Sequence, residues 1–127
     1  MLFGYTILYV EDVPRSLEFY EAAFGVKRRF LHEGGDYGEL ETGGTALAFS
    51  SRQLIADLGK NPSAPLADSH CFEIAFVTED VPAILAQALA AGAVLVQEPE
   101  EMPWGQTTAY VRDQDGFLVE LCTPVAM

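Results

Sequence analysis

The sequence predicts an α+β protein made of two consecutive βαβββ modules, whose strands form a cupped mixed sheet with the helices outside it. Residues 5–14 lie over residues 73–82 without a gap, at an offset of 68 residues, and such self-similarity indicates a repeated structural unit. In each copy an apolar strand pattern is followed by Glu-Asp-Val-Pro and then by the spacing of an amphipathic helix. Three further short strand patterns, separated by turn residues, follow each helix.

The first module begins with a strand pattern over residues 5–10. Asp12 then stands where it can cap a helix, and the proline two residues later is tolerated in a first helical turn. A helix is expected over Pro14–Phe24, because apolar residues recur at i, i+3 and i+7 from Leu17, and Gly25 ends it. Three strands are expected next, with glycine pairs as turns: Val26–His32, Tyr37–Glu41 and Thr45–Ser51.

The second module repeats this order. Its first strand begins at Glu73, Asp80 is the helix cap, and the helix is expected over Pro82–Ala91 with Gly92 after its last turn. The apolar stripe of this helix consists of Ile84, Leu85, Ala88 and Leu89. The strands expected after it are Val94–Gln97, Gln106–Arg112 and Phe117–Thr123.

The domain organisation follows from the repeat. The modules cover about residues 1–51 and 70–127, and residues 52–69 form a linker that contains a short helix around Ile55. A module of roughly 60 residues buries too little surface to be comfortably stable alone. We therefore expect one composite domain over residues 1–127, in which the sheets pair with each other or with a second chain. Because sheet edges need covering, a homodimer is expected.

Composition excludes several classes of partner. Seven Lys and Arg stand against nineteen Asp and Glu, which gives a net charge of −12. This charge repels nucleic acid and anionic membranes, and it attracts cations. The N-terminus lacks the pattern of a secretion signal, and no apolar run approaches the length that spans a bilayer, so a cytoplasmic protein is expected. Cys71 and Cys122 are interpreted as buried small hydrophobic residues.

Four groups of residues resemble the vicinal oxygen chelate superfamily, which comprises the glyoxalases, the bleomycin-resistance proteins and the extradiol dioxygenases. The resemblance covers nearly the whole chain and is carried by Leu8–Asp12, by Phe19-Tyr20 with Phe24-Gly25, by Pro103–Gln106 and by Tyr110–Leu121. It implies the glyoxalase/bleomycin-resistance fold of two βαβββ modules around a cup.

The resemblance also implies four metal positions, which fall here on Tyr5, Ala48, Glu73 and Glu120. A divalent catalytic metal generally takes three or four His, Asp, Glu or Cys ligands, and this set supplies only two carboxylates. His32 and His70 do not restore the set by their spacing. We therefore expect no catalytic metal and no cofactor. The alternative is that Glu73 and Glu120 hold a metal completed by Tyr5, water or substrate.

Glu73 and Glu120 stand in otherwise apolar strand patterns, where a carboxylate must be paired, solvated in a cavity or shifted in its pKa. A polar cavity floor is the favoured interpretation, and pairing with Arg or Lys at a sheet edge is the alternative. Period two places small and polar residues around them on one sheet face. The residues expected to bind a ligand are Tyr5, Ile7, Tyr9, Ala48, Glu73, Trp104, Tyr110 and Glu120.

Three details of this site stay open at the level of sequence. Trp104 lies on a loop, where it can stack on a ligand or cover the core as a lid. The facing of Tyr37 and Tyr110 is ambiguous from the pattern alone. Arg112, beside Asp113, is interpreted as half of a surface ion pair, with the orientation of a ligand anion as the alternative.

Two functions remain. A binding protein that holds a small organic ligand, cationic or aromatic, without a complete metal site is favoured by the charge, the small residues of the cup and the missing metal ligands. The alternative is a metal-dependent lyase, isomerase or dioxygenase of the same superfamily that uses Glu73 and Glu120. The sequence contains no glycine-rich phosphate loop and no serine-hydrolase motif that would favour another chemistry.

Overall fold

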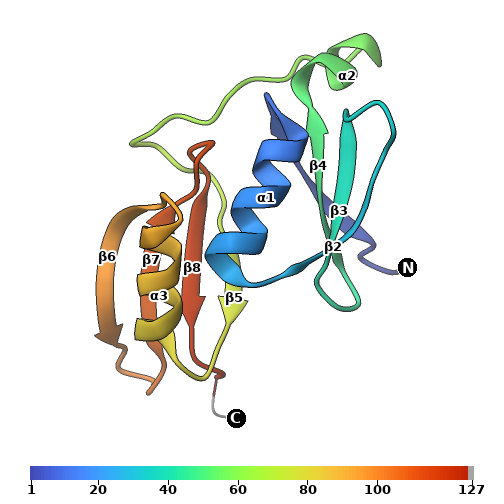
Figure 1. Ribbon diagram of the computed structural model, residues 1–127. Coiled ribbons are helices and arrows are strands. Elements are labelled where there is room, and N and C mark those ends of the chain that lie inside the picture. Colours follow the sequence, from blue (N-terminus) through green and yellow to red (C-terminus); the bar gives the residue numbers. More distant parts are fainter. Residues whose placement is uncertain (126–127) are drawn as a thin grey trace. The chain divides into compact units, whose positions relative to one another are not determined.

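The computed structural model describes residues 1–125. It divides into two compact units, Met1–Ala64 and Pro65–Met127, and each unit contains one βαβββ module (Figure 1). The predicted fold class and the predicted order of elements are confirmed. Among the described residues, no helix has the length and hydropathy needed to cross a membrane.

The first unit is a four-stranded mixed sheet with a helix on one face. In strand order the sheet reads β1-β4-β3-β2, with β1 parallel to β4 and the other pairs antiparallel. Helix α1 packs against β2, β3 and β4 and leaves the opposite face of the sheet free of helix. The elements are β1 Tyr5–Val10, α1 Val13–Phe24, β2 Lys27–Leu31, β3 Tyr37–Glu41, β4 Ala46–Ser51 and the short α2 Arg52–Asp57.

The second unit has the same topology. Its sheet reads β5-β8-β7-β6, again with one parallel pair, β5 with β8, and with α3 packed against β6, β7 and β8. The elements are β5 Ile74–Val77, α3 Val81–Ala90, β6 Val94–Glu101, β7 Thr107–Arg112 and β8 Leu118–Cys122.

The repeat seen in the sequence is preserved in the strand register. Ile7 lies opposite Ala48 in the first sheet, and Ala75, 68 residues after Ile7, lies opposite Glu120 in the second. Each outer edge strand also has a register shift close to its start, between Arg28 and Phe30 in β2 and between Leu95 and Gln97 in β6. A residue of one unit can therefore be compared with a defined counterpart in the other.

Both helices begin in the way that Glu-Asp-Val-Pro predicts. The Asp12 carboxylate accepts a hydrogen bond from the Arg15 backbone N–H at 3.1 Å, and the Asp80 carboxylate accepts one from the Ala83 backbone N–H at 3.1 Å. Such a side-chain cap contributes about 1 kcal/mol to helix stability. Gly25 ends α1 in the left-handed conformation, with φ of 69°, which glycine adopts without a steric penalty.

The core of each unit lies between the helix and the sheet. In the first unit the rings of Tyr20 and Phe49 are both buried, with centroids 5.0 Å apart. Helix and sheet approach closely at Gly38, where a Cβ atom would lie 2.7 Å from a methyl carbon of Leu17. The second unit buries a set of aliphatic side chains in the same place, namely Leu85, Val111, Val119 and Leu121.

The predicted linker, residues 52–69, contains the expected short helix as α2, which packs against β1 and β4, and the boundary between the units falls within it after Ala64. Three other predicted details are wrong. Strand β6 continues to Glu101 instead of ending at Gln97. Of the two cysteines, Cys122 is buried and Cys71 is exposed, because Cys71 lies before the start of β5 and not within the strand. Leu89, predicted in the core stripe of α3, is also exposed.

Candidate ligand site

Three polar side chains meet on the helix-free face of the second unit. Glu73 directly precedes β5, Tyr110 lies on β7, and Glu120 lies on β8 between them. The Tyr110 hydroxyl donates to Glu73 Oε2 at 3.2 Å, Tyr110 is the register partner of Glu120, and Glu73 lies close enough to Glu120 to raise its pKa. The carboxyls are therefore neighbours, as the pseudo-symmetry of the repeat predicts.

The electrostatics of this cluster follow from the closeness of two acids. Partial burial, then the hydrogen bond and the charge of Glu73, raise the pKa of Glu120. Burial, then the charges of Glu120 and Glu73, raise the pKa of Tyr110 to about 12. The neighbouring Glu73 therefore favours the protonated form of Glu120. Tyr110 stays protonated and serves as a hydrogen-bond donor.

The alternative interpretation, in which the two glutamates pair with Arg or Lys, is not what the structure contains. Within the described part of the chain, no Lys or Arg lies in ion-pair distance of either Glu73 or Glu120. Arg112, which the sequence suggested as half of a surface ion pair, donates to the Ala67 carbonyl oxygen at 3.0 Å. The Asp113 carboxylate accepts from the backbone N–H groups of Asp115 and Phe117 in the turn that follows it.

The surroundings of the pair are largely apolar. Ala75 and Val77 on β5 are exposed beside it, and Cys122 lies buried two residues after Glu120. Burial, then the charges of Glu120 and Glu73, raise the pKa of the Cys122 thiol, which keeps it a neutral group. The cluster therefore presents acid oxygens and a phenol beside apolar side chains, with Arg112 two residues after Tyr110 on the same face of β7.

Trp104 lies on the loop between β6 and β7 and is 60% exposed. Its indole N–H donates to Gln106 Oε1 at 2.8 Å, and the Gln106 amide in turn donates to the Thr123 carbonyl oxygen at 2.9 Å. The indole is thus oriented by a hydrogen bond and does not cover the core as a lid. An exposed, oriented indole is suited to stacking on a ligand.

The other predicted ligand-binding residues lie on the first unit, which has its own helix-free face. Tyr5, Ile7 and Tyr9 follow one another on β1, and Ala48 is fully buried on β4 opposite Ile7. Each residue stands on the predicted strand. No hydrogen bond or ion pair joins these four side chains.

A second polar group on that face was not predicted. Glu39 on β3, opposite Ala48, accepts a hydrogen bond from the Tyr37 hydroxyl at 2.9 Å and forms an ion pair with Arg29 at 3.5 Å. Burial, followed by the hydrogen bond to Glu39, raises the pKa of Tyr37 to about 12. Alternation in residues 37–41 places Glu39 on the same face as Tyr37, and this signal could have identified it.

The residues present fit only part of a metal site. Among residues 1–125 no group of three or more His, Cys, Asp or Glu side chains lies close enough together to hold a metal ion. Of the four positions implied by the resemblance, Glu73 and Glu120 offer carboxylates, and a metal there would need Tyr110, water or substrate as further ligands. His32 is exposed and packs against Phe30 and Tyr37, and His70 is exposed.

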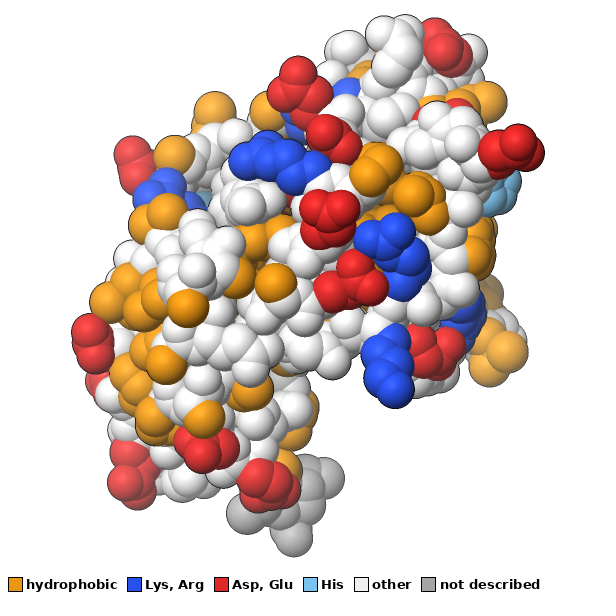
Figure 2. Space-filling view, viewed as in Figure 1, with side chains coloured by type: hydrophobic (Ala, Val, Ile, Leu, Met, Phe, Trp, Pro, Cys, Tyr) orange, Lys and Arg blue, Asp and Glu red, His pale blue; other side chains and the backbone are white. Residues whose placement is uncertain are grey.

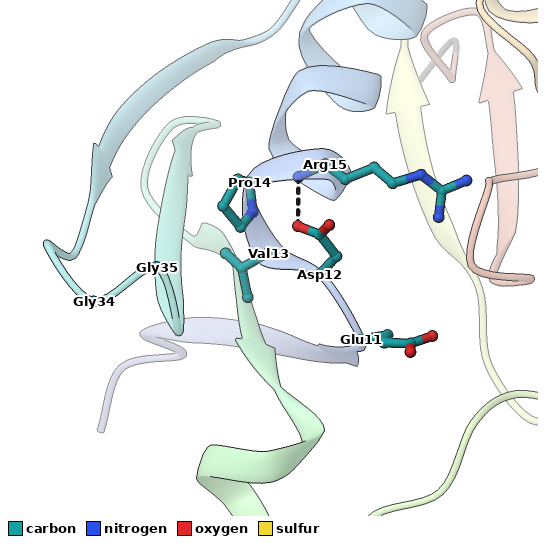
Figure 3. A pocket seen from close by; sticks show the side chains of 7 residues that line it. All are labelled: Glu11, Asp12, Val13, Pro14, Arg15, Gly34 and Gly35. Atoms are coloured by element: carbon teal, nitrogen blue, oxygen red, sulfur yellow. Dashed lines mark hydrogen bonds between the residues drawn. The ribbon is translucent and has the colours of Figure 1, made fainter.

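Two hollows of the surface lie away from these residues. One, of about 490 Å³, lies at the start of α1 and is lined by Glu11, Asp12, Arg15 and the Gly34-Gly35 turn (Figure 3). The other, of about 250 Å³, lies beside Arg112 and the turn before β8. Since neither contains a predicted ligand-binding residue, neither bears on the cluster of Glu73, Tyr110 and Glu120.

Comparison with known proteins places the chain in a family. The model of the Glyoxalase/Bleomycin resistance protein/Dioxygenase superfamily matches residues 2–121. With the two βαβββ modules described above, this match shows that the chain belongs to that superfamily.

Individual relatives are distant. The chain is 29% identical to a Vibrio cholerae protein described as "Probable lactoylglutathione lyase", over 92% of this chain and 86% of that protein. A glyoxalase-related enzyme from Fulvimarina pelagi has a similar structure, with a TM-score of 0.80 at 23% identity, over 98% of this chain and 88% of that one. A protein of unknown function from Agrobacterium tumefaciens has a TM-score of 0.77 at 27% identity, over 98% and 94% of the two chains.

Proposed function

We propose that this protein binds a small organic cation, preferably an aromatic one, on the helix-free face of its second unit, and that binding needs no metal. The observation that carries the proposal is the contact between Glu73 and Glu120 without a basic partner. Glu120 is half-buried beside the exposed Glu73, and a cation or a proton on Glu120 offsets the repulsion between the two acids. A bound cation takes the place of that proton.

Each residue of the cluster has a distinct part in this proposal. Glu73 and Glu120 form charge-assisted contacts with the ligand cation, and the Tyr110 hydroxyl donates to an acceptor or keeps Glu73 in place. Trp104, exposed and oriented by Gln106, supplies a ring face for an aromatic or cationic group.

Acidity should control this binding. Because the pKa of Glu120 is raised, Glu120 is fully ionised only above that raised value, and a cation must compete with its proton below it. We place the protein in the cytoplasm, which is supported by an exposed free thiol at Cys71. No nucleic acid or membrane partner is proposed, since the charge of −12 opposes both.

The test uses benzyltrimethylammonium, an aromatic cation whose charge does not change with pH, and chelator-treated protein. Saturable binding that alters Trp104 fluorescence is expected, with much weaker binding of the neutral benzyl alcohol and the anionic benzenesulfonate. Equal binding of all three probes, or no binding of the cation, would refute the proposal. Trp104 is the sole tryptophan, so the signal has one source.

The second candidate is a metal-dependent lyase, isomerase or dioxygenase in which Glu73 and Glu120 hold the metal. The 29% identity to the probable lactoylglutathione lyase of Vibrio cholerae supports it. A bound divalent metal would polarise a substrate oxygen or activate water. Turnover of lactoylglutathione that a chelator abolishes and added metal restores would establish this candidate in place of the first.

A further inference from the structure

The second unit carries a single Lys or Arg among many acids. Residues 65–127 contain ten Asp and Glu and one basic residue, Arg112, which gives this unit a net charge of −9. Residues 1–64 contain six Lys and Arg against nine Asp and Glu. On the face shown in Figure 2, Lys and Arg side chains lie over α1 and the strands beside it, whereas apolar and acidic side chains lie over α3 and β6. Any contact of the second unit with an anion by a Lys or Arg must therefore come from Arg112.

Arg112 is held in place by a neutral group. Its Nη1 donates to the Ala67 carbonyl oxygen at 3.0 Å. None of the ion pairs found among the described residues includes Arg112, and all of them lie in the first unit. A guanidinium has five N–H donors. The carbonyl contact therefore fixes the side chain without neutralising its charge and leaves further donors for a ligand.

The strand register places Arg112 next to the acid pair. Residues two apart in a strand point to the same face, so Arg112 lies on the same face of β7 as Tyr110. In the ladder between β7 and β8, Tyr110 lies opposite Glu120. Arg112 lies opposite Leu118, two residues before Glu120. Arg112 and Glu120 are therefore diagonal neighbours on one face, with backbone positions about 7–8 Å apart.

Arg112 is also accessible to a ligand. The residue is half-buried, and it lines the hollow of about 250 Å³ beside the turn before β8. The guanidinium thus borders open space and is not enclosed in packed protein. Its planar fork of N–H donors matches the two oxygens of a carboxylate, which an ammonium does not do.

We propose that the organic cation bound by Glu73 and Glu120 also carries a carboxylate or a similar oxyanion, which Arg112 binds. This inference rests on the proposed function, because it names the chemical class of the same ligand, a zwitterion. A simple anion would gain one contact with Arg112 but is repelled by a unit with a charge of −9. A zwitterion adds no net charge, and it satisfies the acid pair and the guanidinium together.

Strand geometry indicates how far apart the two charges of the ligand lie. Two residues along a strand rise by about 7 Å, and this is the separation between Tyr110, beside the acid pair, and Arg112. An α-amino acid carries its ammonium and its carboxylate on one carbon atom and is too short to reach both groups. A ligand with an aromatic ring or a chain of several atoms between its charges fits this separation.

The first test compares ligands that differ only in the anion. Calorimetry with chelator-treated wild-type protein uses para-carboxybenzyltrimethylammonium, its methyl ester and its ortho isomer, which all carry the cation of benzyltrimethylammonium. The para carboxylate should bind roughly 10-fold more tightly than the ester, the gain expected from a hydrogen bond between charged groups. The ortho isomer, whose carboxylate lies beside its own cation, should bind no more tightly than the ester.

This comparison needs no variant and separates the two proposals. If benzyltrimethylammonium and the ester bind but the para carboxylate binds no more tightly than the ester, the zwitterion inference is overturned and the proposed function stands. If none of these cations binds, the proposed function fails and the inference fails with it.

The second test removes the guanidinium. Arg112→Gln should weaken binding of the para carboxylate roughly 10-fold and should strengthen binding of benzyltrimethylammonium, because a positive charge near the cation is lost. Damage to the fold would weaken both. Arg52→Gln is the matched control, since Arg52 also donates to a backbone carbonyl, that of Tyr9 at 3.4 Å, but has Glu11 as an ion-pair partner at 3.9 Å. It should leave the ratio of the two affinities unchanged. A wild-type ratio in Arg112→Gln would overturn the inference.

Discussion

The helix-free faces of the two units both carry glutamates, but these glutamates have different partners in the two units. In the first unit Glu39 has Arg29 and the Tyr37 hydroxyl as partners. In the second unit Glu73 and Glu120 neighbour each other and Tyr110, and within the part of the chain that the structure describes no Lys or Arg lies in ion-pair distance of them. A carboxylate with a basic partner is already neutralised and gains little from a ligand cation, whereas an acid pair without one can gain much. Equivalent topology therefore does not give the two faces equivalent chemistry.

The largest expected effect comes from removing one acid of the pair. Glu73→Gln and Glu120→Gln should each weaken benzyltrimethylammonium binding by about 1 to 3 kcal/mol, the range for a charged hydrogen bond. Glu39→Gln, the matched change in the first unit, should leave the affinity unchanged. Calorimetric titration with thermal unfolding measured beside it separates lost binding from lost stability. An effect of Glu39→Gln as large as that of Glu120→Gln would place the site elsewhere.

The next largest effect is the pH dependence of stability and of cation binding, which Glu120 should cause. The pKa of Glu120 is raised from 4.5, so the folded protein holds more protons than the unfolded chain between 4.5 and the raised value. The free energy of unfolding should therefore fall as pH rises through this window and stay lower above it. Cation affinity should rise over the same window. In Glu120→Gln the contribution of this group to both slopes should vanish, which denaturation and calorimetry at a series of pH values can measure.

The two helix caps provide a matched pair of smaller effects. Asp12→Ala and Asp80→Ala each remove a 3.1 Å cap from the same turn of equivalent helices. Each should lower the free energy of unfolding by about 1 kcal/mol, as measured by chemical denaturation. Asp12 also lines the hollow beside α1, yet neither change should alter cation binding, because neither carboxylate belongs to the acid pair.

The smallest effect concerns the tyrosines. Glu39→Gln should lower the pKa of Tyr37 from about 12 but leave it above the ordinary value of 10.0, because burial is the largest cause of its shift and persists. Spectrophotometric titration of a Tyr110→Phe background isolates Tyr37 from the other strongly shifted phenol. A Tyr37 pKa that does not respond to Glu39→Gln would mean that burial alone determines it.

The fold could be predicted because local signals repeat and agree. Asp12 and Asp80 precede prolines at the same point of two identical tetrapeptides, and the glycine turns separate strands of alternating pattern. The linker could not be assigned, because which unit α2 joins depends on packing against β1 and β4. Leu89 was misplaced for a related reason: α3 has no charged residue to mark its outer side, so its apolar pattern fits more than one face.

The sequence could predict the part of the site that depends on position along a strand. The positions of Glu73 and Glu120 in the repeat predicted that they are neighbours, since the hydrophobic pattern of a strand determines its register. The side of the sheet on which Tyr110 lies, and the role of Arg29 beside Glu39, depend on the register shift in β2 and on pairing between strands. Neither property can be predicted from the periodicity of a single strand.

One measurement tests the central claim, that the acid pair of the second unit binds an organic cation without metal. Benzyltrimethylammonium is titrated calorimetrically into chelator-treated protein at a pH above the raised pKa of Glu120, and the titration is repeated after a divalent metal is added. We expect one cation per chain, with an affinity that added metal does not increase and that Glu120→Gln weakens. Binding that occurs only after metal is added, or that Glu120→Gln leaves unchanged, would contradict the claim.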